Sequence, residues 1–286
     1  MVNLYLGDIM NILQGIIIGI VQGLTEFLPV SSSAHLVFIQ TLLGVESDLA
    51  FDVFLHLGTL IAVMWYFRAD IYQMLKSWWL SIGDILQGRF RQGFMNDPYK
   101  RLAWYVILAT IPVGIVGVLF EDAVDSLFAG ALYVPAFFLF VTGTILYLSQ
   151  RMTSGRINYD NITAKEALFM GLGQACAILP GLSRSGTTIA AGLTIGLNKE
   201  FAAKFSFILS IPAILGAFVF KLSDLSSALT VNFLPIFVGF IVTIISGYMA
   251  IKWMLDLIQN RNLDIFSYYC WVVSLIVFLG SIAHIF

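Results

Sequence analysis

Charged residues are scarce in this chain of 286 residues. Asp, Glu, Lys and Arg make up 11% of it, whereas a soluble globular domain contains about 25%. Hydrophobic residues make up 59%, and the mean hydropathy is +0.90. This composition excludes an ordinary soluble domain and offers no basic surface for nucleic acid. We therefore predict an integral membrane protein with no nucleic-acid partner.

Cysteine and basic N-terminal residues are also scarce. Cys176 and Cys270 are the only cysteines, each within an apolar segment, so we expect neither a disulfide framework nor a cysteine metal site. No Lys or Arg precedes Arg68, so the basic region of a cleavable secretory signal is missing. The first apolar stretch is expected to remain in the mature protein.

Long apolar runs dominate what is present. Six of them approach the roughly 20 residues that cross a bilayer: 50–67, 102–120, 131–149, 202–221, 231–251 and 267–286. Two further apolar regions, 9–43 and 165–197, are interrupted by proline and a polar cluster. Such a break is typical of a re-entrant helical hairpin, where protein or a wet cavity satisfies the irregular backbone. We predict an all-α fold with six transmembrane helices and two re-entrant hairpins.

The placement of the basic residues predicts the orientation. With the N-terminus outside, the inner segments are 68–101, 150–166, 198–204 and 252–265, and they hold 13 of the 15 Lys and Arg residues. This asymmetry agrees with the positive-inside rule. The proposed outer loops are acidic instead, and contain Glu46, Asp48, Glu121, Asp122, Asp125 and Asp224. We expect a multi-pass protein of a cell membrane.

The two halves of the chain resemble each other. The segment from Ile18 to Gln22 resembles the segment from Met170 to Gln174, and residues 51–70 align with 205–224 without gaps. Each half holds one hairpin and three spans, and an odd number of crossings inverts the second half. We predict inverted repeats over 1–150 and 151–286 within a single membrane domain. Their hairpin tips would meet near the midplane, where such folds bind substrate.

The tip of the first hairpin carries a carboxylate and an amide. An ionisable group such as Glu26 is costly inside a membrane segment and usually functional, although a structural pair with Arg184 is an alternative. Gln22 lies one helical turn earlier on the same face. It can bind substrate, a metal or Glu26, or only pack between helices.

Hydroxyls and an imidazole follow in the same tip. Ser31, Ser32 and Ser33 come directly after Pro29, and we expect at least one of them only to cap a helix. Ser32 and His35 would share a face of that helix. The imidazole could then deprotonate a hydroxyl or protonate a leaving group.

The second tip supplies a guanidinium among glycines and hydroxyls. The fork of donors on Arg184 suits phosphate oxygens, and the turn from Gly181 to Gly186 would begin a half-helix whose N–H groups attract anions. Further hydroxyls come from Ser183, Ser185, Thr187 and Thr188. Packing between helices is the alternative role for the two threonines.

Two more histidines lie outside these tips. Asp52 and His56 form an i,i+4 pair at the outer end of a span. They could hold a metal or orient His35, but we expect a local surface pair. His284, near the C-terminus, is expected at the membrane interface.

The two tips together carry a family resemblance. Gln22-x-x-x-Glu26 with Pro29-x-Ser-Ser-Ser-x-His35, and Pro180-Gly-x-Ser-Arg-Ser-Gly-x-Thr188, resemble the two signature motifs of the undecaprenyl-diphosphate phosphatase family associated with bacitracin resistance. The resemblance extends over essentially the whole chain. That family begins the first motif with Glu or Gln. Because this chain has Gln22, its first motif contains a single carboxylate.

The resemblance implies an enzyme that removes the terminal phosphate of a long polyprenyl diphosphate at the outer membrane face. The monophosphate carrier would be recycled for cell-envelope glycan synthesis. The resemblance also implies a divalent cation, Mg²⁺ or Ca²⁺, with Glu26 and Gln22 as its ligands. The expected partners are the lipid substrate and membrane lipid, and a homodimer is left open.

The residues themselves suggest roles at the two tips. Arg184 and its turn would bind the diphosphate, while Glu26 would bind the metal or act as a base. Ser32 is the candidate nucleophile, with His35 as its proton partner or as an alternative nucleophile, and attack by water stays open. The expected substrate-binding residues are Gln22, Ser31, Ser33, Gly181, Ser183, Ser185, Gly186 and Thr188.

A transporter or flippase for a phosphate-bearing substrate is the main alternative, since inverted repeats with broken helices are common in transporters. The acid, serine and histidine favour hydrolysis, because a carrier has no use for groups poised for covalent chemistry. A lipid kinase is disfavoured because the G-x-x-x-x-G-K-[ST] nucleotide loop is missing.

Overall fold

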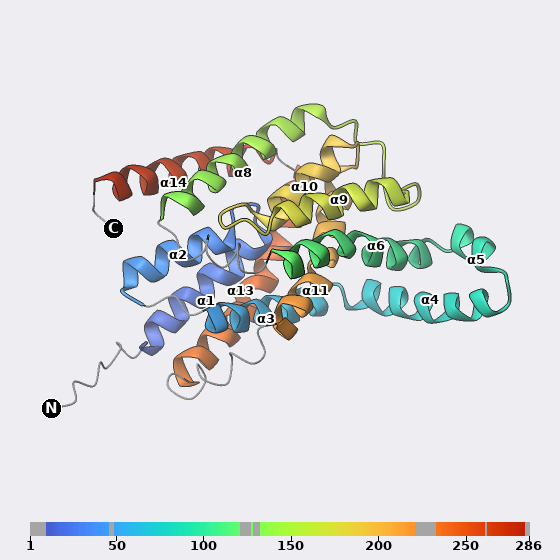
Figure 1. Ribbon diagram of the computed structural model, residues 1–286, viewed down its shortest axis with the longest axis horizontal. Helices are drawn as coiled ribbons and strands as arrows, with labels where there is room; N and C mark the ends of the chain where they lie inside the picture. The colour runs from blue at the N-terminus through green and yellow to red at the C-terminus, as the bar shows by residue number, and fades with distance from the viewer. Residues whose placement is uncertain are drawn as a thin grey trace.

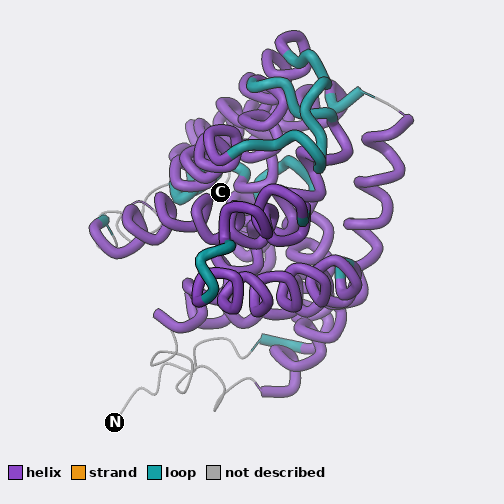
Figure 2. Tube along the Cα trace, turned by 90° about the vertical axis from the view of Figure 1, so that its right-hand side faces the viewer, coloured by secondary structure: helices purple, strands orange, loops and turns teal. Residues whose placement is uncertain are grey.

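The computed structural model describes residues 10–45, 49–120, 127, 132–220, 233–260 and 262–283. Twelve helices account for nearly all of this described part, which contains no strand (Figures 1 and 2). They are α1 (Ile12–Phe27), α2 (Ser32–Leu43), α3 (Leu49–Tyr66), α4 (Arg68–Leu86), α5 (Phe90–Asn96), α6 (Pro98–Leu119), α8 (Tyr133–Met152), α9 (Ala164–Cys176), α10 (Arg184–Thr194), α11 (Lys199–Phe220), α13 (Phe233–Asn260) and α14 (Asp264–Ile282).

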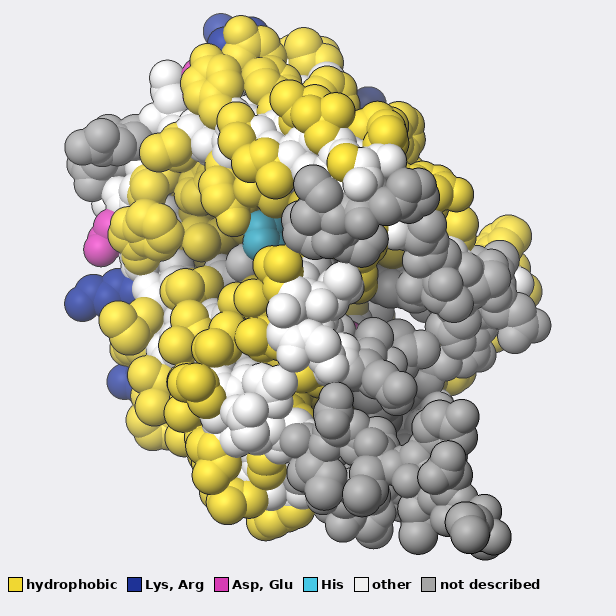
Figure 3. All heavy atoms as spheres, turned by 90° about the vertical axis from the view of Figure 1, so that its left-hand side faces the viewer, with side chains coloured by type: hydrophobic (Ala, Val, Ile, Leu, Met, Phe, Trp, Pro, Cys, Tyr) yellow, Lys and Arg dark blue, Asp and Glu magenta, His cyan; other side chains and the backbone are white. Residues whose placement is uncertain are grey.

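Five helices, α6, α8, α11, α13 and α14, are long and apolar enough to cross a membrane. A sixth candidate span comes from α3, which continues into α4 after a bend of 81°. These helices match the six apolar runs in the sequence, so the prediction of an all-α integral membrane protein is confirmed. Figure 3 shows hydrophobic side chains over most of the described surface on one face, with charged side chains confined to its margins.

The two interrupted regions each form two helices joined by a non-helical tip. Residues 9–43 correspond to α1 and α2, and residues 165–197 correspond to α9 and α10. Asn11 and Gln14 form a capping box at the start of α1, and Thr163 and Glu166 form the equivalent box at the start of α9. These caps satisfy the free N–H groups of each first turn.

Each hairpin is packed tightly against one long helix. α1 runs along α13, and α9 runs along α6. A Cβ on Gly19 would lie 2.4 Å from the carbonyl oxygen of Gly239, and a Cβ on Gly171 would lie 2.3 Å from that of Ala109. Backbone therefore touches backbone at both contacts. Gly19 and Gly171 are matched positions in the two repeated segments of the sequence.

The other helices pack around the α1–α13 and α6–α9 pairs. α8 and α14 lie side by side at one edge of the molecule, while α3 contacts both α11 and α13 (Figure 1). The predicted inner segment 68–101 contains α4 and α5. α4 buries Met74, Ser77 and Ser81 and packs on α6. The acidic outer-loop residues and His284 lie outside the described residues.

Candidate active site

The first hairpin tip places a buried carboxylate just before a strained turn. Glu26 lies in the last turn of α1 and is 5% exposed. The backbone of Ser31 has φ +67°, in the left-handed region that L residues avoid, at a cost of order 1 kcal/mol. Ser31 Oγ accepts a hydrogen bond from the N–H of Ala34 at 3.3 Å. This confirms that one hydroxyl of the run caps α2.

The second tip depends on a glycine. Gly181 has φ +93°, and a Cβ there would lie 2.2 Å from the carbonyl oxygen of Pro135. α8 supports the tip through Thr142, whose Oγ1 accepts a hydrogen bond from Ser183 N at 3.0 Å. Ser183 Oγ then accepts from Gly186 N at 3.0 Å. Ser183 is thus the N-cap of α10, and Arg184 is the first residue of that helix.

The two tips meet, as the sequence predicted. The backbone N–H of Gly181 donates to Ser33 Oγ at 3.2 Å. In the other direction, Ser185 Oγ donates to the carbonyl oxygen of Leu28 at 3.0 Å. Segments about 150 residues apart in the chain therefore form one polar cluster.

Glu26 and Arg184 form the central ion pair of this cluster. Arg184 Nη2 lies 2.5 Å from Glu26 Oε1. The other carboxylate oxygen, Oε2, accepts from Ser32 Oγ at 2.7 Å and from Gln22 Nε2 at 3.1 Å. Because Ser32 donates its hydrogen to the carboxylate, Glu26 has contacts beyond a structural pair with Arg184. The arrangement places a carboxylate base between a hydroxyl and a cation, each on its own carboxylate oxygen.

His35 bonds other groups than Ser32. Its Nδ1 is 2.8 Å from the carbonyl oxygen of Ser31, and a carbonyl only accepts, so Nδ1 carries a hydrogen. In the neutral ring Nε2 then accepts from Tyr269 Oη at 2.8 Å. The two rings are stacked, with centroids 5.6 Å apart. The structure therefore gives Glu26, rather than His35, the contact with the Ser32 hydroxyl.

His56 belongs to the cluster, so the expectation of a local surface pair with Asp52 is wrong. Its Nδ1 donates to the backbone carbonyl of Asp52 at 2.6 Å, and its Nε2 lies 3.4 Å from Glu26 Oε2. The Asp52 carboxylate instead accepts from Gln40 Nε2 at 2.7 Å. The available signal was that an ionisable residue in an apolar span is usually functional. The same argument that singles out Glu26 applies to His56.

The hydroxyls of α10 hold Arg184 in place. Thr188 Oγ1 donates to the carbonyl oxygen of Arg184 at 2.8 Å and lies 2.5 Å from Ser206 Oγ. Arg184 Nη1 donates to the carbonyl oxygen of Ser206 at 3.3 Å. Thr188 is completely buried, so its contacts are with α10 and α11. Thr142, Ser206 and Tyr269 contribute to the site although neither motif contains them.

The donor chemistry near Glu26 suits a hard cation. Gln22 Oε1 is buried and has no hydrogen-bond partner in the described part of the chain, and it shares its side chain with the amide that bonds Glu26. A carboxylate, an amide oxygen and the Ser32 hydroxyl are oxygen ligands of the type Mg²⁺ and Ca²⁺ prefer. The described residues contain no cluster of three acidic, histidine or cysteine side chains able to hold a metal. Substrate oxygens would have to complete such a site, as is common for Mg²⁺.

Comparisons with known proteins find one family and several similar relatives. The profile of the family described as bacitracin resistance protein BacA matches residues 15–276. An undecaprenyl-diphosphatase of Methanobrevibacter smithii is 74% identical over 277 residues, covering 97% of this chain and 100% of the relative. The undecaprenyl-diphosphatases of Methanosphaera stadtmanae and Carboxydothermus hydrogenoformans are 45% and 41% identical, covering 96% and 94% of this chain and 99% and 97% of their own.

Proposed function

This chain belongs to the bacitracin resistance protein BacA family, and we propose that its reaction takes place where the hairpin tips join Glu26, Ser32 and Arg184. The chain is a membrane phosphatase that hydrolyses undecaprenyl diphosphate to the monophosphate and inorganic phosphate. The family and the reaction predicted from the two motifs are confirmed. The observation that carries the proposed site is the hydrogen bond from Ser32 to Glu26 beside the Arg184 guanidinium.

The first step is attack by Ser32 Oγ on the terminal phosphorus. Glu26 Oε2 takes the hydroxyl hydrogen, since it already accepts that hydrogen bond. The bond between the terminal phosphorus and the bridging oxygen breaks, and undecaprenyl monophosphate leaves with the bond electrons. Water then attacks the phosphorus of the phosphoserine, and the bond between that phosphorus and Ser32 Oγ breaks. Glu26 returns its proton to Oγ, inorganic phosphate leaves with one hydrogen of the water, and the other is released as a proton.

Arg184 is proposed to bind the phosphoryl oxygens in both steps. It begins α10, so the guanidinium and the free N–H groups of the helix start attract the same anion. The incoming phosphate would compete with Glu26 for the guanidinium. Because Nη1 of the guanidinium also donates to the carbonyl oxygen of Ser206, Arg184 keeps a contact with α11 when that ion pair opens.

A divalent cation is part of the proposal, with Glu26 and Gln22 as its protein ligands. When bound, it would neutralise the charge of the diphosphate and polarise the terminal phosphoryl group. The support is the buried Gln22 oxygen that lacks a partner beside the carboxylate.

We also propose that the two hairpins are re-entrant and that the halves are inverted repeats. The support is that α1 packs on α13 as α9 packs on α6, with matched glycines at the contacts. Both hairpins break at polar tips that bond to each other. With the basic residues gathered in the inner segments, the tips would open to the outer face of the cell membrane.

The test measures inorganic phosphate released from undecaprenyl diphosphate by the purified full-length protein. Ser32→Ala and Glu26→Gln are each expected to lower the rate by about a thousandfold. Ser154→Ala changes an exposed serine far from the tips in sequence and should leave the rate unchanged. If Ser32→Ala retains turnover, Ser32 is not the nucleophile, and His35 or water attacks the phosphorus instead. Chelation should stop the wild-type reaction, and Mg²⁺ or Ca²⁺ should restore it.

A further inference from the structure

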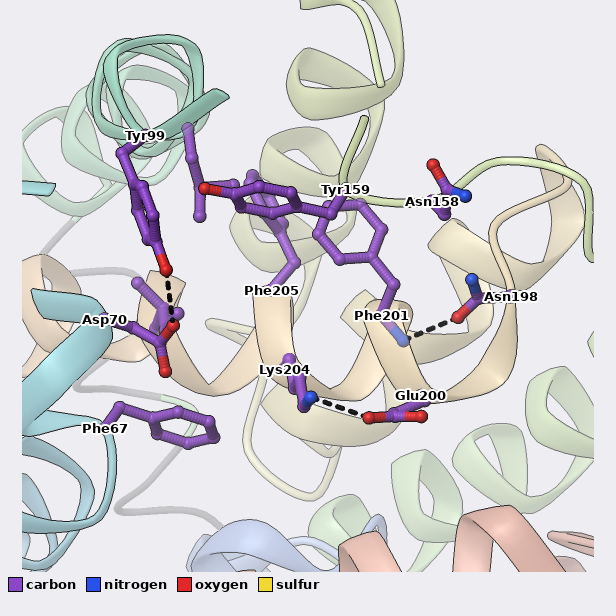
Figure 4. Close-up of a pocket in the computed structure, with 12 residues that line it drawn as sticks. Phe67, Asp70, Tyr99, Asn158, Tyr159, Asn198, Glu200, Phe201, Lys204 and Phe205 are labelled. Atoms are coloured by element: carbon purple, nitrogen blue, oxygen red, sulfur yellow. Dashed lines mark hydrogen bonds and ion pairs between the residues drawn. The ribbon is translucent and has the colours of Figure 1, made fainter. Parts of the chain in front are cut away.

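A cavity lies where the two halves of the chain meet. It has a volume of about 320 Å³ (Figure 4). The first half contributes the start of α4 and of α6, and the second half contributes the loop before α9 and the start of α11. α9 has 13 residues, so its length alone separates this loop from the second tip by about 20 Å. Tyr159 on the cavity wall is therefore well away from that tip, whereas Phe205 adjoins Ser206, which accepts a hydrogen bond from Arg184.

Aromatic rings form much of the cavity wall. Tyr99 and Tyr159 meet edge to face with centroids 5.4 Å apart, and Tyr159 meets Phe201 in the same way at 6.3 Å. Phe67 and Phe205 complete the aromatic lining. The faces of such rings are negative and attract cations, while their area favours an apolar body.

Uncompensated charge in the cavity is negative. Lys204 is neutralised by Glu200, which lies 2.6 Å from its Nζ. Asp70 has no cation within ion-pair distance among the described residues, and its one hydrogen bond there comes from Tyr99 Oη at a long 3.5 Å. Figure 4 shows Asp70 and Tyr99 at one side of the cavity, apart from the Lys204–Glu200 pair. A carboxylate beside aromatic rings is thus left without a counter-ion.

Tyr159 adds a polar group to the aromatic wall. Its hydroxyl is buried and has no hydrogen-bond partner in the described part of the molecule. Burial raises the pKa of Tyr159, and the nearby Tyr99, Asp97 and Asp70 raise it further. The hydroxyl therefore stays neutral and can accept a hydrogen bond from a ligand.

We propose that this cavity binds a small organic ammonium, with Asp70 as its counter-ion and Tyr99, Tyr159 and Phe201 as its aromatic walls. An anion is disfavoured because Lys204 is already paired. A divalent metal ion is disfavoured because it needs several oxygen ligands, and Asp70 is the one unpaired carboxylate among the described lining residues. A bound ammonium would contact both halves of the chain and hold their ends together.

Choline is the probe, and its uncharged isostere 3,3-dimethylbutanol is the control ligand. Purified wild-type protein in detergent is titrated with each while the thermal unfolding midpoint and tyrosine fluorescence are followed. Choline should raise the midpoint and bind saturably, whereas the isostere should bind at least about tenfold more weakly because it lacks the charge. Equal responses to the two compounds would overturn the proposal.

Two variants test the residues. Asp70→Asn and Tyr159→Leu should each weaken choline binding by about tenfold or more. Asp160→Asn removes an exposed carboxylate next to Tyr159 and should leave choline binding unchanged. Phosphate release at the wild-type rate by each variant would show that it is folded, because none of these residues belongs to the hairpin tips. Wild-type choline affinity in Asp70→Asn would refute the site.

The ammonium could come from a lipid headgroup or from a free solute, and the lipid composition of the membrane distinguishes the two. The protein is reconstituted in vesicles of phosphatidylglycerol alone or with an equal part of phosphatidylethanolamine. A lipid headgroup as the natural ligand would compete, so choline affinity would fall in the second vesicles. Unchanged affinity would support a free ammonium from solution.

Discussion

His56 on α3 reaches the carboxylate of Glu26 on α1, with its Nε2 3.4 Å from Oε2. The same oxygen accepts the hydrogen bond from Ser32. The opposite ring nitrogen, Nδ1, is fixed by the backbone carbonyl of Asp52. Because Nδ1 donates to that carbonyl, Nε2 can donate to Glu26 only when both ring nitrogens are protonated. The imidazolium of His56 is therefore placed to hold the proposed base beside Ser32.

Replacing His56 tests this positioning role. His56→Ala should lower kcat about tenfold, the value of one hydrogen bond to a charged group, while KM stays within about twofold. His56→Gln should recover most of the lost rate, because an amide can still donate to Glu26. The measurement is phosphate release across a substrate series. A glutamine variant as slow as the alanine variant would argue for a structural role alone.

Arg184→Lys separates charge from geometry. Lysine keeps the positive charge near Glu26 but lacks the planar guanidinium, which can donate hydrogen bonds to two oxygens at once. We expect kcat/KM to fall by about a hundredfold, with little loss of fold stability. Arg184→Ala should abolish turnover. Arg156→Lys makes the same change at an exposed arginine and should have no effect, and a fully active Arg184→Lys enzyme would contradict the proposed phosphate contact.

Tyr269→Phe removes the hydrogen bond to His35 and keeps the stacked ring. The proposed mechanism gives the Ser32 hydrogen to Glu26 rather than to His35, so we expect a rate within about threefold of wild type. His35→Ala should be severe, because it removes both the bond to Ser31 and the ring stacked on Tyr269. Tyr268→Phe changes the neighbouring exposed tyrosine and serves as the control. A loss in Tyr269→Phe as large as in His35→Ala would instead make the tyrosine hydroxyl essential.

Gly181→Ala should destabilise the second tip. The added Cβ would meet the backbone of Pro135, and its φ of +93° disfavours any side chain, so a loss of about 3 kcal/mol is expected. Gly155→Ala also has positive φ but open space around it, and should cost about 1 kcal/mol. Thermal unfolding of both variants measures the difference, and equal losses would show that the contact with α8 is unimportant.

The hairpins and their chemistry could be predicted because polar residues interrupt apolar runs, and such interruptions are costly unless they serve a site. Glu26, Ser32 and Arg184 were recognised for this reason. The partners inside the site were harder to predict. Ser32 and His35 lie on the same helix, and their spacing predicts a contact between them. Ser31 caps that helix close to the end of α1, so the Ser32 hydroxyl bonds Glu26 instead.

His56 and α4 show what the sequence pattern could not specify. The contact between His56 and Glu26 depends on how α1 and α3 cross, and local spacing contains no information about that crossing. α4 follows a bend of 81° and exposes Tyr72 and Trp79. The basic residues indicate an inner segment at the surface, but local spacing does not predict the angle at which α4 leaves α3.

The bare contact between Gly19 and Gly239 has one more consequence. The backbones of α1 and α13 touch here without intervening side chains. α1 therefore cannot shift toward α13, and its position is fixed by the fold. The carboxylate at its end is thus aligned before any lipid arrives. When the lipid binds, the flexible isoprenoid tail is the part that changes conformation. The position of the carboxylate is set when the protein folds.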